Sequence, residues 1–149
     1  MPDSVYDFRS DNVGGAAPEL LEALVAAGDG TAAPYGDDDF TRRMVQRFSA
    51  TFERPVQVFP VATGTGANSV ALAALANPYG AIYCHETAHI NVYECGAPEF
   101  FTSAKLVGLP GRDFKLEAAA LDEALVLAGR GNATRVQPFA LNITQPTDF

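Results

Sequence analysis

Beyond residue 55 the chain alternates short runs typical of β-strands with segments of helical periodicity, and this order constrains its fold more than any other feature. Strands are expected at 56–61, 81–84, 105–109 and 139–143, and helices at 69–77 and 116–127. Pro60, which has no N–H to donate, falls near the end of the first strand. Strands that alternate with helices favour an α/β layer in which mostly parallel strands are covered by helices.

Two further helices are predicted before this region. Pro18 stands where a helix favours its first residue, leucines follow at helical spacing, and Gly28 ends the run. The second helix begins near Phe40 and places apolar residues on one face and arginines on the other. The loop between them ends in Asp38 and Asp39, which we expect to cap the second helix at the positive end of its dipole.

Composition and charge exclude several classes of protein. The chain has 149 residues, a length typical of one domain. Of these residues 48% are apolar, which is enough to form a core. The net charge is −8, so binding to nucleic acid or to an anionic membrane is disfavoured. The longest apolar stretch, 70–76, is too short to cross a bilayer. With two cysteines and no charged-then-apolar leader, a cytoplasmic location is expected.

A glycine-rich turn at 61–68 leads from the first predicted strand into a helix. Glycine allows a ligand to approach the backbone, and the free N–H groups and dipole of the following helix favour an anion such as phosphate. Thr63 and Thr65 can each add a hydroxyl donor. Ser69 stands where a dinucleotide fingerprint needs its third glycine, and no Walker lysine follows. A tight turn without a ligand therefore stays open as an alternative.

The segment His85-Glu86-Thr87-Ala88-His89 matches the zinc-protease pattern H-E-x-x-H. Two imidazoles at i and i+4 would share one helical face, with Glu86 as general base. The motif follows a predicted strand almost at once, and no third ligand stands at a recognised spacing, although Glu94 or Cys95 could serve. Alternatives are a ligand-facing histidine at the carboxyl edge of a sheet and a structural histidine, the latter for His85 in particular.

Five segments in order resemble the N-terminal part of low-specificity threonine aldolases, in the aromatic amino acid β-eliminating lyase/threonine aldolase family. They are Phe8–Asn12, Pro34–Asp38, Ala62–Asn68, Ala88–Glu99 and Leu141–Gln145. The resemblance implies an α/β fold: the N-terminal part of a pyridoxal 5′-phosphate (PLP)-dependent transferase-like, fold-type-I large domain, with a mostly parallel sheet and covering helices, and incomplete. Residues 1–55 would form an N-terminal arm with two helices, and residues 56–149 the first four strands of the sheet.

The resemblance also implies which residues meet cofactor and substrate. His89 would stack on the pyridine ring of PLP and assist proton transfer near the substrate hydroxyl, and the H-E-x-x-H match would then be a coincidence. Ser10 would lie by the substrate carboxylate, and Tyr35 close to the active site. The cofactor phosphate would be held at the glycine-rich turn, by Thr63, Gly64 and Thr65.

Such enzymes split a β-hydroxy amino acid to glycine and an aldehyde, and their active sites form at the interface of a homo-oligomer. In the family, the Schiff-base lysine and the aspartate that pairs with the pyridine nitrogen lie beyond the matched segments. Neither Lys105 nor Lys115 sits in a matching motif, so we expect the chain to lack the Schiff-base lysine and to be inactive alone. Two alternatives stay open: a truncated, non-catalytic module that pairs with a partner subunit, and a zinc hydrolase that uses His85, Glu86 and His89.

Overall fold

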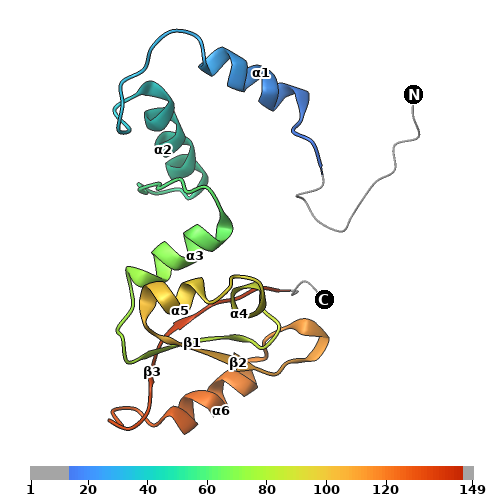
Figure 1. The fold of residues 1–149 in the computed structure, drawn as a ribbon, viewed down its shortest axis with the longest axis vertical. Coiled ribbons are helices and arrows are strands. Elements are labelled where there is room, and N and C mark those ends of the chain that lie inside the picture. The colour runs from blue at the N-terminus through green and yellow to red at the C-terminus, as the bar shows by residue number, and fades with distance from the viewer. Residues whose placement is uncertain (1–13, 146–149) are drawn as a thin grey trace, which may run out of the picture. The chain divides into compact units, whose positions relative to one another are not determined.

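The computed structural model describes residues 14–145, whose contacts divide the chain into two compact units between Phe59 and Pro60. The first unit contains α1 (Pro18–Ala27) and α2 (Asp39–Thr51). The second contains α3 (Gly64–Ala73), α4 (His89–Val92), α5 (Ala97–Thr102), the 3-10 helix η2 (Arg112–Phe114) and α6 (Ala118–Ala128), together with the sheet (Figure 1). Within residues 14–145, no helix combines the length and the apolar character that crossing a membrane requires.

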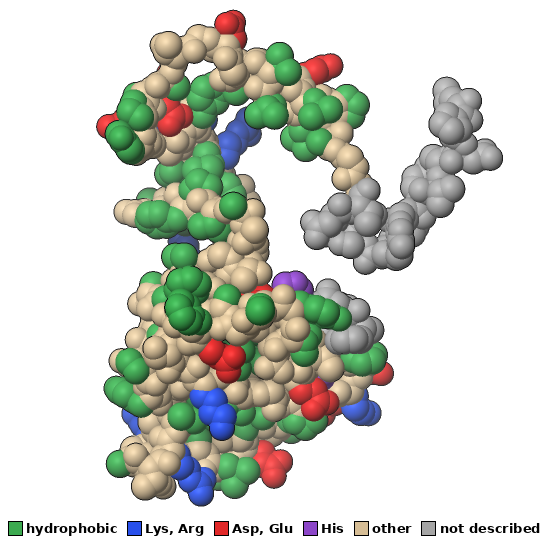
Figure 2. All heavy atoms as spheres, in the orientation of Figure 1, with side chains coloured by type: hydrophobic (Ala, Val, Ile, Leu, Met, Phe, Trp, Pro, Cys, Tyr) green, Lys and Arg blue, Asp and Glu red, His purple; other side chains and the backbone are tan. Residues whose placement is uncertain are grey.

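Helix α1 confirms the prediction of its two ends. Pro18 is its first residue, and the N–H of Gly28, the C-cap, donates to carbonyls of the last turn. Apolar side chains of α1 lie at the surface (Figure 2). Leu20, Leu24 and Val25 are all exposed. The first unit therefore presents an apolar helix surface.

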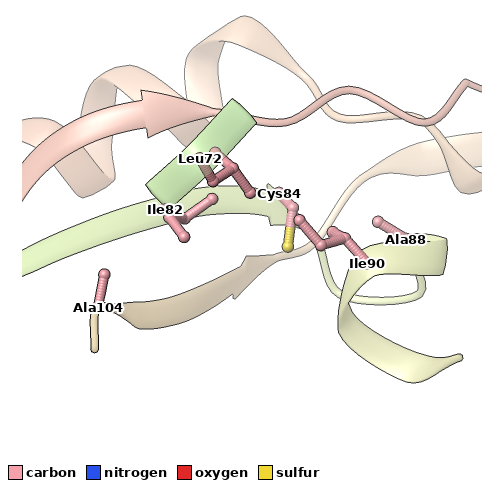
Figure 3. Close-up of a cluster of buried hydrophobic side chains, with 6 residues drawn as sticks. All are labelled: Leu72, Ile82, Cys84, Ala88, Ile90 and Ala104. Carbon is pink, nitrogen blue, oxygen red and sulfur yellow. The ribbon is translucent and has the colours of Figure 1, made fainter. Parts of the chain in front are cut away.

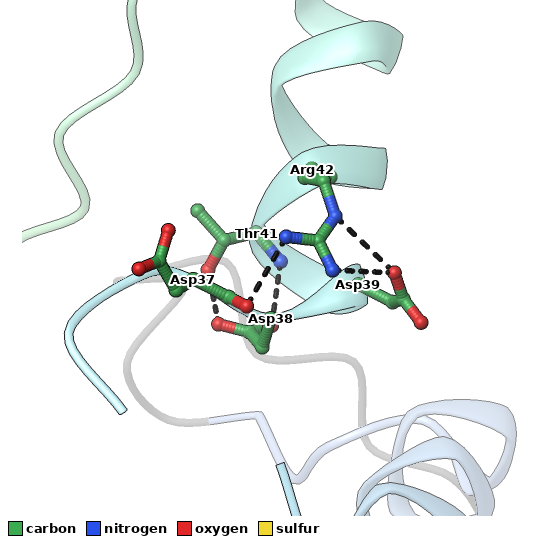
Figure 4. Close-up of polar contacts among 5 residues, drawn as sticks. All are labelled: Asp37, Asp38, Asp39, Thr41 and Arg42. Carbon is green, nitrogen blue, oxygen red and sulfur yellow. Dashed lines mark hydrogen bonds and ion pairs between the residues drawn. The ribbon is translucent and has the colours of Figure 1, made fainter. Parts of the chain in front are cut away.

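Asp38 is the N-cap of α2, as predicted. Its Oδ1 accepts from the N–H of Thr41 at 2.8 Å, and its Oδ2 accepts from the Thr41 hydroxyl at 2.7 Å (Figure 4). Asp39 is instead the first helical residue and binds the Arg42 guanidinium at 2.8 Å. Its charge still lies in the first turn, where the helix dipole favours an anion.

The sheet has three parallel strands in the order β2–β1–β3: β1 (Gly80–His85), β2 (Lys105–Leu109) and β3 (Gln137–Leu141). The parallel α/β prediction is confirmed, and every residue of the central strand β1 is buried, as expected for a strand covered on both faces. The pairing of β1 with β3 is irregular between Ala81 and Ile82, opposite Pro138, which cannot donate to the ladder.

The strand predicted at 56–61 is not formed, so the described residues contain three strands where four were predicted. Apolar, β-branched composition suggested a strand there, but Pro55 directly precedes the segment and Pro60 lies within it, and neither has a backbone N–H to donate. No described strand pairs with this segment. The predicted helix at 69–77 begins earlier, at Gly64, because Thr63 caps it.

Helices cover both faces of the sheet. Alternate residues of β1 point to opposite sides: Ile82 and Cys84 pack with the residues of α3 and α4, and Ala81 and Tyr83 pack on the α6 side. The first of these two clusters is drawn in Figure 3 and consists of Leu72, Ile82, Cys84, Ala88, Ile90 and Ala104. This core fixes α3 and α4 above the same strand.

Candidate functional site

The glycine-rich turn, where the sequence predicts an anion site, forms the first turn of α3, and we call this first turn the cradle. Thr63 is the N-cap, in an extended conformation, and its Oγ1 accepts from the N–H of Gly66 at 3.0 Å. The N–H groups of Gly64 and Thr65 belong to the first turn, where a helix offers them no acceptor. A Cβ added at Gly64 would meet no atom within 4 Å, so this turn is open to a ligand. Open N–H groups at the positive end of a helix dipole suit phosphate.

A cavity of about 380 Å³ borders this cradle, between α3 and α5. Ser69 lies in its wall, and the Ser69 hydroxyl oxygen is buried without a hydrogen-bond partner among the described residues. The other lining residues are Thr63, Thr65, Gly66, Val70, Ala73, Ala97 and Phe101. The polar edge of this cavity is thus the cradle, and its remaining wall is largely apolar.

His89 opens α4 just beyond the carboxyl end of β1, the edge at which open α/β sheets bind ligands. Its side chain is 46% exposed, and its Nδ1 lies 2.9 Å from Oε1 of Glu94. Its ring centroid is 5.6 Å from that of Tyr93, at an interplanar angle of 48°. One edge of the imidazole is therefore anchored while much of the ring stays accessible.

Glu94 joins His89 to α3. The same Oε1 that faces His89 also accepts from Nδ2 of Asn68 at 2.7 Å, and the Glu94 side chain has no exposed surface. Asn68 lies one turn after Gly64, so His89 is two hydrogen bonds away from the helix that forms the cradle. Sequence reasoning missed this link, since 26 residues separate Asn68 from Glu94. The only sequence feature that pointed to this contact was that Asn68 and Glu94 both lie in segments that resemble the family.

The two histidines of the H-E-x-x-H segment lie on different elements. His85 ends β1, whereas His89 begins α4, so their imidazoles do not share a helical face. His85 is buried, its Nδ1 accepts from the N–H of Thr87 at 3.1 Å, and its Nε2 lies 3.4 Å from the carbonyl oxygen of Gly111. Among residues 14–145, no group of three His, Cys, Asp or Glu residues is arranged to hold a metal ion.

The structure does not unite all the predicted site residues. Thr63, Gly64 and Thr65 share one turn, and His89 is tied to the same helix. Tyr35 belongs to the first unit, where it adopts a left-handed conformation (φ 61°) and is fully exposed. Ser10 lies outside the described residues. The substrate-binding roles of Ser10 and Tyr35 stay predictions.

The chain is similar to threonine aldolases along its whole length. It is 39% identical over 149 residues to the low specificity L-threonine aldolase of Pseudomonas sp. strain NCIMB 10558, covering 99% of this chain and 42% of the relative. The low specificity L-threonine aldolase of Pseudomonas aeruginosa is 38% identical, with the same coverage. A probable low-specificity L-threonine aldolase of Schizosaccharomyces pombe is 28% identical over 137 residues, 91% of this chain and 35% of the relative. The chain thus spans about two fifths of the length of these curated relatives.

The fold agrees with this similarity. A solved structure of Leishmania major threonine aldolase matches with a TM-score of 0.79 and 27% identity, over 87% of this chain and 37% of that one. A model of the beta-eliminating lyase family matches residues 7–146, a range that contains the cradle, His89 and Glu94. The chain therefore belongs to the beta-eliminating lyase family.

Proposed function

We propose that this chain supplies the phosphate-binding turn and the ring-stacking histidine of a PLP-dependent lyase of the threonine aldolase type. The observation that supports the proposal is the link from His89 through Glu94 to Asn68, which connects an accessible imidazole to the helix whose N-terminus is open. A planar cofactor with a phosphate needs both groups together. The names of the relatives support the choice of reaction.

The residues of this chain have distinct roles in that reaction. The N–H groups of Gly64 and Thr65 would donate to the phosphate, and the Thr63 hydroxyl keeps a proton that its capping contact does not use. His89 would lie against the pyridine ring. Because its Nδ1 is bound to Glu94, Nε2 is the nitrogen that would hold or accept the proton of the substrate's β-hydroxyl. PLP, when bound, withdraws electrons from the reacting carbon of the amino acid.

The substrate of this proposal is a β-hydroxy amino acid, cleaved to glycine and an aldehyde, with Ser10 and Tyr35 on the substrate side. We place the reaction in a cytoplasmic homo-oligomer whose sites lie at subunit interfaces. Neither lysine of the chain serves as the covalent anchor in the proposal. Lys105 begins β2, beside Ala81 at the amino end of the parallel strands, whereas His89 follows their carboxyl end. Because neither Lys105 nor Lys115 stands in a matching family motif, the chain on its own is expected to be inactive.

Ligand binding tests the cofactor site. Pyridoxine 5′-phosphate is the probe, because it has no aldehyde and cannot react with lysines; inorganic phosphate is the second ligand. The two should compete. We expect His89→Ala to weaken the pyridoxine phosphate affinity roughly 2- to 10-fold, since ring pairs contribute about 0.5–1.5 kcal/mol and each 1.4 kcal/mol is tenfold. The affinity for inorganic phosphate should not change.

Two outcomes would contradict the proposal. If neither ligand binds, or if His89→Ala leaves the pyridoxine phosphate affinity unchanged, the alternative of a non-catalytic module is favoured. Incubation with threonine and PLP tests the expected inactivity. Acetaldehyde formed faster than with PLP alone would show that the isolated chain is a competent enzyme.

A further inference from the structure

We propose that Glu94 is a positioning residue, which fixes the tautomer and orientation of the His89 ring relative to the first turn of α3. Its carboxylate links a residue of α3 to the first residue of α4: a single oxygen, Oε1, accepts from Asn68 at 2.7 Å and lies 2.9 Å from Nδ1 of His89. The consequence for cofactor binding rests on the proposed function. The consequence for the imidazole does not.

The chemistry of the contact selects one form of the imidazole. An ionised carboxylate only accepts hydrogen bonds, so Nδ1 of His89 must carry the proton that it shares with Glu94. In a neutral ring Nε2 is then unprotonated and ready to accept. His85 shows the opposite arrangement, because its Nδ1 accepts from the N–H of Thr87. The two histidines of the chain should therefore be opposite tautomers.

Burial and backbone geometry hold the carboxylate in place. Glu94 has no exposed side-chain surface, and its Oε2 is buried without a partner among the described residues. Burying a carboxylate with one oxygen unpaired is unfavourable, a cost not expected of a residue that only fills space. The next two residues, Cys95 and Gly96, are both left-handed (φ 52° and 70°), and the N–H of Ala97 donates to the Glu94 carbonyl at 2.9 Å. This turn directs the carboxylate inward before α5 begins.

These contacts restrict the imidazole without covering it. Rotation of the ring about its Cβ–Cγ bond would break the contact with Glu94, whereas 46% of the His89 side chain remains exposed. A ring held in this way would present the same face to any ligand bound at the cradle. Glu94 thus acts through His89 and does not itself need to touch a ligand.

Histidine NMR in the alkaline range, where the spectra no longer change with pH, tests the proposal, because the 149-residue chain has only two histidines. Long-range ¹H–¹⁵N spectra identify the protonated nitrogen of each ring. We expect Nδ1–H for His89 and Nε2–H for His85. Glu94→Met, which keeps side-chain volume but removes the acceptor, should shift His89 toward Nε2–H. Glu94→Gln, which retains an acceptor oxygen, should restore Nδ1–H.

The control is Glu99→Met, the same change at an exposed residue of α5, and it should leave both histidines unchanged. Unaltered His85 signals in the Glu94 variants show that the fold is intact. The proposal is overturned if wild-type His89 is the Nε2–H tautomer, or if Glu94→Met leaves His89 as Nδ1–H. If Glu94→Met unfolds the chain, Asn68→Ala provides the test instead. Loss of the hydrogen bond between Asn68 and Glu94 should broaden the His89 signals but not those of His85. Unchanged His89 signals would refute the proposal.

Ligand binding separates this inference from the proposed function. Glu94→Met should lower the affinity for pyridoxine 5′-phosphate to that of His89→Ala, with phosphate affinity unchanged. If the NMR result holds but no pyridoxine phosphate binds, the proposed function fails and the positioning role stands. If the ligand binds equally well to wild type and Glu94→Met, the positioning role fails and the proposed function stands.

Discussion

Gly64→Pro and Gly64→Ala form a matched pair that isolates one backbone donor of the cradle. Proline at the first helical position removes the N–H of residue 64 and suits the helix otherwise. The preceding residue, Thr63, is already extended (φ −143°, ψ 157°), which is the conformation that proline requires before it. A Cβ at this position meets nothing within 4 Å. Both variants should therefore fold. They differ in the backbone N–H of residue 64, which the alanine variant keeps and the proline variant lacks.

The size of the effect follows from the charge of the ligand. A hydrogen bond to a charged group contributes about 1.5–3 kcal/mol, and each 1.4 kcal/mol is tenfold, so Gly64→Pro should weaken phosphate binding by roughly 10- to 150-fold. Gly64→Ala keeps the donor and should stay within about twofold of wild type, because its methyl group enters open space. Equilibrium dialysis with inorganic phosphate and with pyridoxine 5′-phosphate measures both.

Helicity by circular dichroism checks that the two variants retain α3. Equal affinities of the Pro and Ala variants, in folded protein, would refute the assignment of this N–H to the phosphate. A large loss in both variants would instead show that the ligand needs the space beside Gly64.

Three further predictions follow from the described contacts. The N–H and hydroxyl of Thr41 hold the pKa of Asp38 below its usual 3.8. The Asp38 cap therefore stabilises α2 fully above pH 3.8, and this stabilisation is lost as the pH falls through the lowered pKa. Asp38→Asn should remove this acid dependence of helicity, and an unchanged dependence of helicity on pH would contradict the prediction. Burial raises the pKa of the Cys84 thiol to about 11. A thiol reagent should therefore modify the exposed Cys95 in the folded chain and Cys84 only after unfolding, whereas two equally fast thiols would be inconsistent with this core. At Gly80 a Cβ would collide with the ring of Phe139 on β3; Gly80→Ala should lower the free energy of unfolding by roughly 1–3 kcal/mol in urea titrations, and an unchanged midpoint would argue against this packing.

Local signals predicted most of the elements. Helix α2 has a strong cap and an amphipathic face, and β1 and β2 are short apolar runs, so each agrees with its own sequence. The segment 56–61 shows the limit of this reasoning, because its composition favours a strand but its prolines and the lack of a described neighbour prevent pairing. Helices α4 and α5 have only four and six residues, too few to show a period.

The site was predictable only in part, for a related reason. The cradle is a local feature, and a Thr-Gly-Thr-Gly sequence at a helix start indicates it directly. The role of Glu94 depends on Asn68, which is distant in sequence and reaches it only because α3 and α4 cover the same face of the sheet. An isolated Tyr-Glu-Cys-Gly sequence carries no trace of that contact.

The central position of β1 has a consequence for the order in which this unit opens. Its backbone pairs with β2 on one side and β3 on the other, so its amides should exchange with deuterium more slowly than those of either neighbour. His89 follows this strand after three residues. The His89 imidazole therefore lies next to the strand that should unfold last. Local unfolding of other segments of this unit would leave its position unchanged.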